Sequence, residues 1–192
     1  MNLDFSRVRE LLAAQPPQPL PLDGLRAAAV MVPLLACEDG THLLFAQRGD
    51  HLPHHAGEIA FPGGGFEPTD ADLWATALRE AQEEVALVPE RVACLGQLDD
   101  FVSIHGYRVT PYVVAAPWPY PYRPDQDEMV AVLQVPLRHF LDPAIHRRED
   151  WSHKGRTFPI HFYRYGEQQI WGLTAAMVRQ LLKRLAPLLP PV

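Results

Sequence analysis

A proline followed by three glycines, at residues 62–65, constrains this chain more than any other feature of its sequence. Glycine is the least constrained residue and proline the most, so we predict a tight backbone loop here, not a regular strand or helix. Residues 69–72 read Thr-x-x-Asp, which is a helix-start signal with an acid in the first turn. Apolar residues then recur at helical spacing as far as Val85. The sequence therefore predicts a glycine loop that leads into a helix.

Three carboxylates lie on one side of this predicted helix. Glu80, Glu83 and Glu84 are three and four residues apart, which makes them neighbours in space. Like charges at this spacing destabilise a helix by roughly 0.2–0.5 kcal/mol per pair unless a cation lies among them. Arg79 is expected to point to another side of the helix and to reach Glu83 at most. Because Mg²⁺ prefers oxygen ligands and completes its shell with water and phosphate, the pattern predicts a metal site, the alternative being a solvated acidic face.

This helix and the residues before it resemble the signature box of the Nudix hydrolases. The core of that box, Arg-Glu-apolar-x-Glu-Glu-x-Gly-apolar, is similar to residues 79–87. Two positions depart from it, because the family's first glutamate falls on Ala71 and its last glycine on Ala86. In relatives the first glutamate braces the helix arginine, and Asp70 or Asp72 is expected to replace it here. The helix is expected to end without a left-handed glycine.

A narrower resemblance lies upstream, to the coenzyme A diphosphatase branch of this family. The matching residues are Leu43, Leu44, Arg48, His55, Gly57, Phe61, Pro62, Gly63 and Gly64, together with the run 170–175. The branch usually carries a second basic residue where Pro53 stands, and a nearby histidine is expected to contribute instead. These histidines are His51, His54 and His55. The substrate-binding residues that the resemblance implies are Arg48, His55, Phe61, Gly63 and Gly64.

The resemblance implies an enzyme that requires Mg²⁺ or Mn²⁺. Glu80, Glu83, Glu84 and a backbone carbonyl near Gly64 would hold the metal, and a box glutamate or Glu128 would remove the proton from water. The implied substrate is coenzyme A or an acyl derivative, cut at its diphosphate to 3',5'-ADP and 4'-phosphopantetheine. Alternatives are the hydrolysis of ADP-ribose or dinucleoside polyphosphates, or a nucleotide sensor that does not cut. The expected partner is this small nucleotide, and the expected state is a monomer or a homodimer.

Composition describes one globular domain with attached ends. A length of 192 residues at 47% hydrophobic is enough for one sizeable core. The net charge of -6 argues against binding to nucleic acid or to an anionic membrane. Two cysteines, Cys37 and Cys94, show neither a disulfide framework nor metal spacing, and no signal peptide or membrane span is visible, so we expect a cytoplasmic protein. Residues 1–24 are expected to form a helix and a proline-rich arm, and residues 25–192 the Nudix domain.

Hydrophobic patterning predicts strands and helices that mix without regular alternation. The expected helices are 5–14, 137–141 and 172–185, and the expected strands are 27–35, 42–47, 92–98, 107–115, 129–135 and 158–165. The first helix would cap the domain or contact a partner subunit. By resemblance the fold is α/β, the Nudix fold, an α/β/α sandwich with a mixed β-sheet flanked by helices. The irregular order agrees with it, because a doubly wound sheet would alternate regularly.

Three further stretches each have two interpretations. They are the loop with Asp99, Asp100, Ser103 and His105, the aromatic segment with Trp118, Tyr120 and Tyr122, and the basic residues Arg147, Arg148, Lys154 and Arg156. The loop is a polar turn or touches substrate. The aromatic segment packs as a wall or stacks on an adenine, and packing is favoured. The basic residues form plain surface or bind a separate phosphate.

Overall fold

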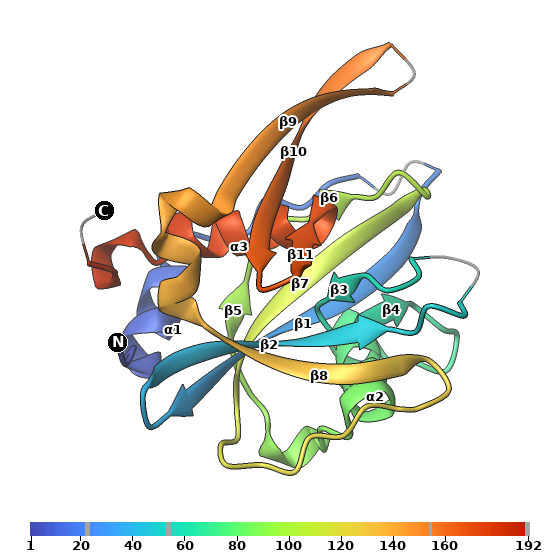
Figure 1. Cartoon of the computed structure of the whole chain (residues 1–192). Coiled ribbons are helices and arrows are strands. Elements are labelled where there is room, and N and C mark those ends of the chain that lie inside the picture. Colours follow the sequence, from blue (N-terminus) through green and yellow to red (C-terminus); the bar gives the residue numbers. More distant parts are fainter. Residues whose placement is uncertain (22–23, 53–54, 154, 191–192) are drawn as a thin grey trace.

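The computed structural model describes residues 1–21, 24–52, 55–153 and 155–190. These residues form an eight-stranded sheet, a separate three-stranded sheet and three α-helices, with short 3-10 turns between them (Figure 1). The helices are α1 (Phe5–Ala13), α2 (Leu73–Val85) and α3 (Gly172–Arg184). The large sheet contains β1 (Arg26–Cys37), β2 (Gly40–Arg48), β3 (Ile59–Ala60), β4 (Gly63–Gly65), β5 (Ala93–Gln97), β6 (Phe101–Val102), β7 (Tyr107–Ala116) and β8 (Met129–Pro136). The small sheet contains β9 (His146–His153), β10 (Arg156–Tyr165) and β11 (Gln168–Trp171).

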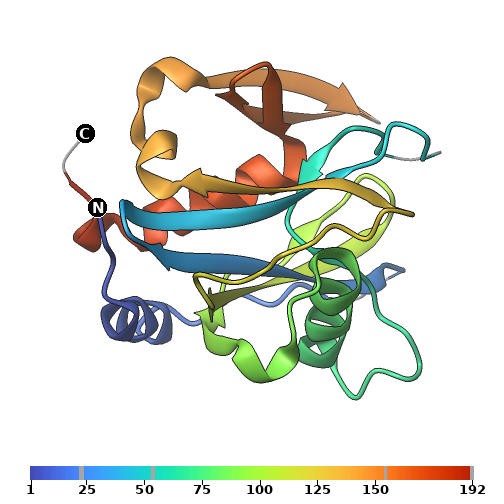
Figure 2. The same ribbon diagram turned by 60° about the horizontal axis from the view of Figure 1, so that its bottom comes forward.

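Strand β1 is the centre of the large sheet. It pairs in parallel with β7 and antiparallel with β2 and β4, while β8 and β3 both pair with β2. Helix α2 lies on one face of the sheet, and α3 with the small sheet lies on the other (Figure 2). This arrangement confirms the predicted sandwich with a mixed sheet flanked by helices.

The apolar run of β1 explains the two cores. Successive strand side chains point to opposite faces, so a strand buried on both faces must be apolar throughout. Val32 and Leu34 pack in the core that contains the apolar residues of α3, whereas Met31 and Leu35 pack in the core beneath α2. All four side chains are fully buried. The sheet thereby holds α2 in a fixed position against its central strand.

The three glycines form strand β4, so the predicted loop is wrong. Gly63, Gly64 and Gly65 pair antiparallel with residues 28–30 of β1. A Cβ atom at Gly63 would lie 2.4 Å from the carbonyl oxygen of Ala29, and one at Gly64 would lie 2.4 Å from a carboxylate oxygen of Glu80. Glycine is required here for close approach of backbone and carboxylate, and not for a turn.

Helix α2 begins later than the Thr-x-x-Asp signal predicted. Asp72 is its N-cap residue, and the Asp72 carboxylate accepts a hydrogen bond of 2.8 Å from the Ala75 N–H. An N-cap carboxylate satisfies an N–H that has no partner in the first turn. The acid therefore precedes the helix, where the prediction placed it inside the first turn.

The end of α2 is left-handed, although no glycine is present. Ala86 has φ 57° and ψ 29°, and its N–H donates to carbonyls of the last helical turn. The Tyr120 hydroxyl donates to the Ala86 carbonyl at 2.8 Å and accepts from the Val88 N–H at 3.2 Å. This hydroxyl fixes the turn that follows the helix. The aromatic segment thus packs against α2, which is the interpretation that the sequence favoured.

Helix α1 packs on β5 of its own chain. Val8 and Leu12 are buried in the core, and Leu12 lies so close to Gly96 that a Cβ there would be 2.7 Å from the Leu12 Cβ. These contacts agree with a cap on the domain.

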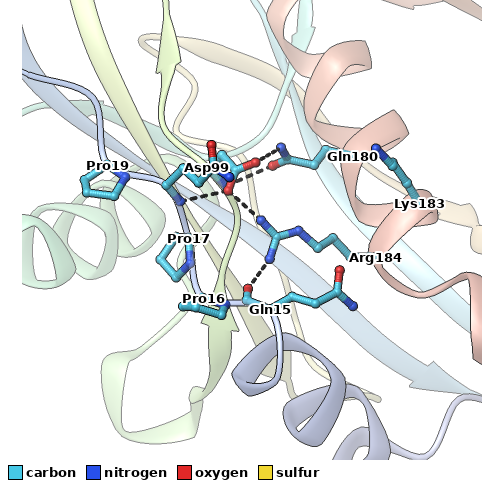
Figure 3. A pocket seen from close by; sticks show the side chains of 9 residues that line it. Gln15, Pro16, Pro17, Pro19, Asp99, Gln180, Lys183 and Arg184 are labelled. Atoms are coloured by element: carbon cyan, nitrogen blue, oxygen red, sulfur yellow. Dashed lines mark hydrogen bonds and ion pairs between the residues drawn. The ribbon is translucent and has the colours of Figure 1, made fainter.

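The proline segment that follows α1 is tied down by two aspartates. Asp99 accepts from the Gln18 N–H at 2.9 Å and Asp100 from the Leu20 N–H at 3.0 Å. Arg184 of α3 pairs with Asp99 and donates to the Gln15 carbonyl, beside a cavity of about 640 Å³ (Figure 3). Asp99 and Asp100 are therefore structural, as the polar-turn interpretation proposed.

Candidate active site

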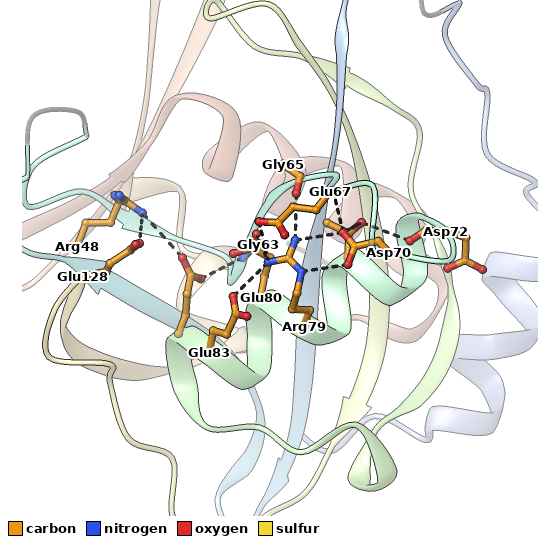
Figure 4. Close-up of polar contacts among 12 residues, drawn as sticks. Arg48, Gly63, Gly65, Glu67, Asp70, Asp72, Arg79, Glu80, Glu83 and Glu128 are labelled. Atoms are coloured by element: carbon orange, nitrogen blue, oxygen red, sulfur yellow. Dashed lines mark hydrogen bonds and ion pairs between the residues drawn. The ribbon is translucent and has the colours of Figure 1, made fainter.

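Helix α2 and strand β4 position the carboxylates. Glu84 is turned toward β4, where its carboxylate accepts a hydrogen bond of 3.0 Å from the Gly63 N–H and keeps only 8% of its side chain exposed. Glu80 is 17% exposed and lies against Gly64, while Glu83 is 57% exposed at the rim (Figure 4). The three glutamates thus lie on one side of the helix, where Glu84 is the most buried and Glu83 the most exposed.

Arg79 holds two of these glutamates, so the prediction that it points away and reaches Glu83 at most is wrong. Its Nη1 donates to Glu80 at 2.9 Å and to Glu83 at 3.1 Å. Its Nε and Nη2 donate to the two oxygens of Asp70 at 3.0 and 3.1 Å. A guanidinium carries five donors in a rigid fork and can bind several acceptors at once. The Asp70 carboxylate holds the Arg79 guanidinium beside Glu80 and Glu83. The guanidinium in turn lowers the pKa of Asp70 far below its usual value.

Asp70 is consequently the acid that replaces the family's first glutamate. The Asp70 side chain is only 5% exposed and also accepts from the Thr76 hydroxyl at 2.9 Å. Asp72, the other candidate, caps the helix instead. The departure at Ala71 therefore leaves the bracing of Arg79 intact.

Arg48 and Glu128 complete the charged cluster from the other side. The Arg48 Nη1 atom lies 3.8 Å from an oxygen of Glu84 and 3.8 Å from an oxygen of Glu128. The loop before β8 is tied to the end of α2, because the Asp125 N–H donates to the Glu84 carbonyl at 3.0 Å. The Gly49 N–H donates to the Glu128 carbonyl at 2.8 Å. These backbone bonds bring Glu128 to the box glutamates.

The carboxyls of Glu80 and Glu84 are costly to ionise in this cluster, and one nitrogen atom of Arg48 lacks a hydrogen-bond partner among the described residues. Burial raises the pKa of Glu84 to about 8, with the Glu80 and Glu128 carboxylates raising it further and the Gly63 N–H and Arg48 opposing the rise. Burial also raises the pKa of Glu80. The Arg48 Nε atom is buried without a hydrogen-bond partner among the residues that the structure describes. Added positive charge would stabilise the carboxylates, and an added acceptor would satisfy Arg48.

The donor set fits a hard divalent cation, but the ligands are not preassembled. Within the described ranges, no group of three or more His, Cys, Asp or Glu side chains is arranged to hold a metal ion. Arg79 holds Glu80 and Glu83, while Gly63 and Arg48 hold Glu84. Carboxylate and carbonyl oxygens are the ligands that Mg²⁺ and Mn²⁺ prefer. Metal binding would therefore require these side chains to exchange arginine partners for the ion.

Two of the predicted substrate-binding residues lie elsewhere. Phe61 is buried and stacks on Phe45 with ring centroids 4.6 Å apart, so it supports β4 from the core. His55 is hydrogen-bonded to Glu58 at 2.8 Å, and its ring meets the edge of His105. None of these contacts involves Glu80, Glu83 or Glu84.

Of the other residues singled out in the sequence, His51 is hydrogen-bonded to the Asp127 carbonyl at 3.0 Å, beside the loop that carries Glu128. Pro53, His54 and Lys154 lie outside the described residues. Arg147 and Arg148 each form an ion pair with an acid on the same strand, which offsets their charge.

Comparisons with known proteins show the family to which the chain belongs. Residues 25–159 match the NUDIX domain family model. The uncharacterized Nudix hydrolase NudL of Escherichia coli O1:K1 / APEC is 40% identical over 167 residues, which is 81% of each chain. The chain belongs to the Nudix hydrolase family, whose members generally use divalent metal ions such as Mg²⁺ or Mn²⁺.

Solved structures share the fold at low sequence identity. The Nudix hydrolase RenU of M. Smegmatis is 17% identical with a TM-score of 0.58, covering 88% of this chain and 90% of its own. A MutT/nudix family protein from Enterococcus faecalis is 15% identical with a TM-score of 0.53, covering 96% of this chain and 70% of its own. No helix in the described ranges is long and apolar enough to cross a membrane.

Proposed function

We propose that this Nudix hydrolase cleaves the diphosphate bond of coenzyme A or an acyl derivative, releasing 3',5'-ADP and (acyl-)4'-phosphopantetheine. The observation that carries the proposal is the position of Arg48. This residue belongs to the upstream sequence similar to the coenzyme A diphosphatase branch, and it lies 3.8 Å from Glu84 of the box helix. The same upstream sequence supplies Gly63 and Gly64, which permit the close approach of β4 to the box glutamates.

Glu80, Glu83, Glu84 and the Gly64 carbonyl would hold Mg²⁺ or Mn²⁺. When bound, the ion would neutralise phosphate charge and lower the pKa of a bound water from ~15.7 toward ~7. Arg79 would hold the glutamates beside strand β4, because it also donates to the Gly65 carbonyl at 3.1 Å. In this proposal Arg79 would hold the carboxylates beside β4 until a metal ion takes its place at Glu80 and Glu83.

Arg48 and Glu128 would act on the substrate side of the cluster. The buried Arg48 Nε lacks an acceptor among the described residues, and a guanidinium matches phosphate oxygens in paired fashion. Glu128 is 55% exposed, so its carboxylate can reach a solvent water and accept its proton. Attack in line with the leaving phosphate then requires only positioning and charge neutralisation.

A substrate panel tests the proposal. Purified protein with Mg²⁺ or Mn²⁺ is incubated with coenzyme A, acetyl-coenzyme A, ADP-ribose and diadenosine tetraphosphate, and the products are separated by chromatography. We expect the highest kcat/KM for a coenzyme A substrate, with 3',5'-ADP as a product. A clear preference for ADP-ribose or the dinucleotide would contradict the substrate assignment.

Matched variants test the site itself. Glu83→Gln and Glu84→Gln are expected to lower kcat by at least about 10²-fold, because each removes a carboxylate that would neutralise or hold charge in the transition state. Glu90→Gln changes an exposed glutamate beyond the helix and should leave kcat unchanged. Full turnover in the Glu84→Gln variant would contradict the assignment of the box carboxylates.

A further inference from the structure

Strand β9 leaves one edge open. The small sheet has the order β11-β10-β9, and within the described part of the chain β9 pairs only with β10. The β9–β10 hairpin extends away from the body of the molecule, on the sheet face opposite to α2 (Figures 1 and 2). An open edge presents unpaired N–H and C=O groups that can bind another strand.

The charges on this edge cancel one another. Residues 147–150 read Arg-Arg-Glu-Asp, and all four side chains are at least 40% exposed. Arg147 lies 3.3 Å from Glu149, and Arg148 lies 2.7 Å from Asp150. Proteins protect exposed edges with charges that repel a second strand. A strand with two positive and two negative side chains gives no net repulsion to a copy of itself.

One face of the hairpin is aromatic. Trp151 and Phe158 are directly opposite each other on β9 and β10, and they are 46% and 45% exposed. Beside them, Phe162 stacks on Trp171 with an interplanar angle of 6°, and Arg147 lies 4.4 Å above the Phe162 ring. Large exposed aromatic side chains that adjoin one another are typical of a surface that binds a partner.

We propose that the partner is a second copy of this chain, bound through antiparallel pairing of the two β9 edges about a two-fold axis. Side chains that lie opposite in an antiparallel pair share one face of the sheet. Pairing centred on Arg148 places Arg147 opposite Glu149, and pairing centred on Glu149 places Arg148 opposite Asp150. Symmetry doubles each of these attractions. The residue on the axis meets its own copy, and it keeps an oppositely charged neighbour on its own strand.

The pairing joins the two small sheets into one sheet of six strands. The aromatic faces of both hairpins become continuous, which buries part of Trp151 on the edge strand β9. Helix α2, which carries Glu80, Glu83 and Glu84, lies on the other face of the large sheet from the hairpin (Figure 2). The dimer therefore forms without covering the candidate active site.

Sedimentation velocity over a concentration series tests this proposal. We expect the wild type to sediment as a dimer. The variants Arg147→Glu/Arg148→Glu and Glu149→Arg/Asp150→Arg should each sediment as monomers, since every opposite pair becomes a like pair. An equimolar mixture of these two variants should form a dimer, because opposite charges then face each other again. The control variant Arg7→Glu/Arg138→Glu changes two exposed, acid-paired arginines elsewhere and should remain dimeric.

A monomeric wild type at every concentration would overturn the proposal. A dimer that persists in both charge variants would show that another surface holds the copies together, and so would overturn it as well. Circular dichroism of each variant shows whether it is folded. Recovery of the dimer in a mixture of two variants that are each folded therefore separates lost pairing from lost structure.

Discussion

The Glu84 carboxyl experiences two opposing influences. Burial disfavours its charged form, whereas the Gly63 N–H and the Arg48 guanidinium favour it. Burial prevails, since the pKa is raised to about 8. A cation bound beside Glu84 would favour the charged form and would therefore lower this pKa.

The raised pKa gives a direct prediction for stability against pH. Because the folded state binds this proton more tightly than the unfolded state, the stabilisation is complete below about pH 4.5 and is lost as the pH rises to about 8. Glu84→Gln removes this loss. The free energy of unfolding of the metal-free variant should therefore exceed that of the wild type by roughly 1–4 kcal/mol at pH 8.5 and equal it near pH 4.5. Urea denaturation in a chelator at both pH values measures the difference.

Two controls accompany that measurement. Glu90→Gln alters an exposed glutamate and should follow the wild type at both pH values. Saturating Mg²⁺ should stabilise the wild type and not Glu84→Gln, because the ion binds the folded carboxylate. An unchanged pH dependence in Glu84→Gln would show that another group causes it.

Arg48 is expected to oppose metal binding and to support substrate binding. Its Nη1 atom lies 3.8 Å from both Glu84 and Glu128, so its charge competes with a cation for these oxygens. Arg48→Gln should bind Mn²⁺ about 3- to 10-fold more tightly, as charge repulsion is removed. The same variant should raise the KM about 10- to 100-fold, because a charged hydrogen bond to phosphate is lost.

Calorimetric titration with Mn²⁺ and initial-rate kinetics measure these two effects separately. Arg138→Gln is the matched control, since Arg138 is exposed and pairs with Asp39 at a distance of 3.5 Å. Neither the dissociation constant for Mn²⁺ nor the KM should change in that variant. If Arg48→Gln weakened the binding of both Mn²⁺ and substrate, Arg48 would support the structure of the cluster and would not compete with the metal ion.

At the scale of elements, the end of α2 shows how a missing glycine is tolerated. A left-handed alanine costs roughly 1–2 kcal/mol through the clash of its Cβ atom. The Tyr120 hydroxyl satisfies the carbonyl of Ala86 and the N–H of Val88, which holds the turn in spite of this cost. The helix therefore ends where the family places its glycine, with a different side chain.

Ala86→Gly is expected to stabilise the protein by about 1 kcal/mol, because the clash is removed at the cost of some backbone entropy. Gln82→Gly replaces an exposed right-handed residue in the same helix and should destabilise it by about 0.5–1 kcal/mol. The free energy of unfolding in urea measures both. Equal destabilisation by the two glycines would indicate that the left-handed conformation of Ala86 is not strained.

Strands β4 and β9 show which elements local patterns do not reveal. β4 consists of three glycines and is a strand only because β1 pairs with it. β9 reads His-Arg-Arg-Glu-Asp-Trp-Ser-His, with neither an apolar run nor clear alternation, and it was not predicted. Its ladder with β10 supplies the conformation. The apolar strands β1, β7 and β8 were predicted near their observed bounds, because buried side chains leave a pattern in the sequence.

At the scale of the whole molecule, the charged cluster depends on four separate segments. Asp70 precedes α2, Glu80 lies on it, Arg48 ends β2 and Glu128 precedes β8. The sheet order brings these segments together, since β2 pairs with both β1 and β8 while α2 packs beneath β1. The resemblance to a known family predicted most of these residues, but not their mutual contacts.

The sequence by itself determined the helix, the spacing of its glutamates and the mixed order of strands. These follow from periodicities of 3.6 and 2 residues, which depend on neighbours along the chain. Only the tertiary structure decided that Asp70 braces Arg79, that Glu84 is buried beside Arg48, and that three glycines form a strand. Each of these depends on burial or pairing with residues distant in sequence, and such energies arise only when the chain is folded.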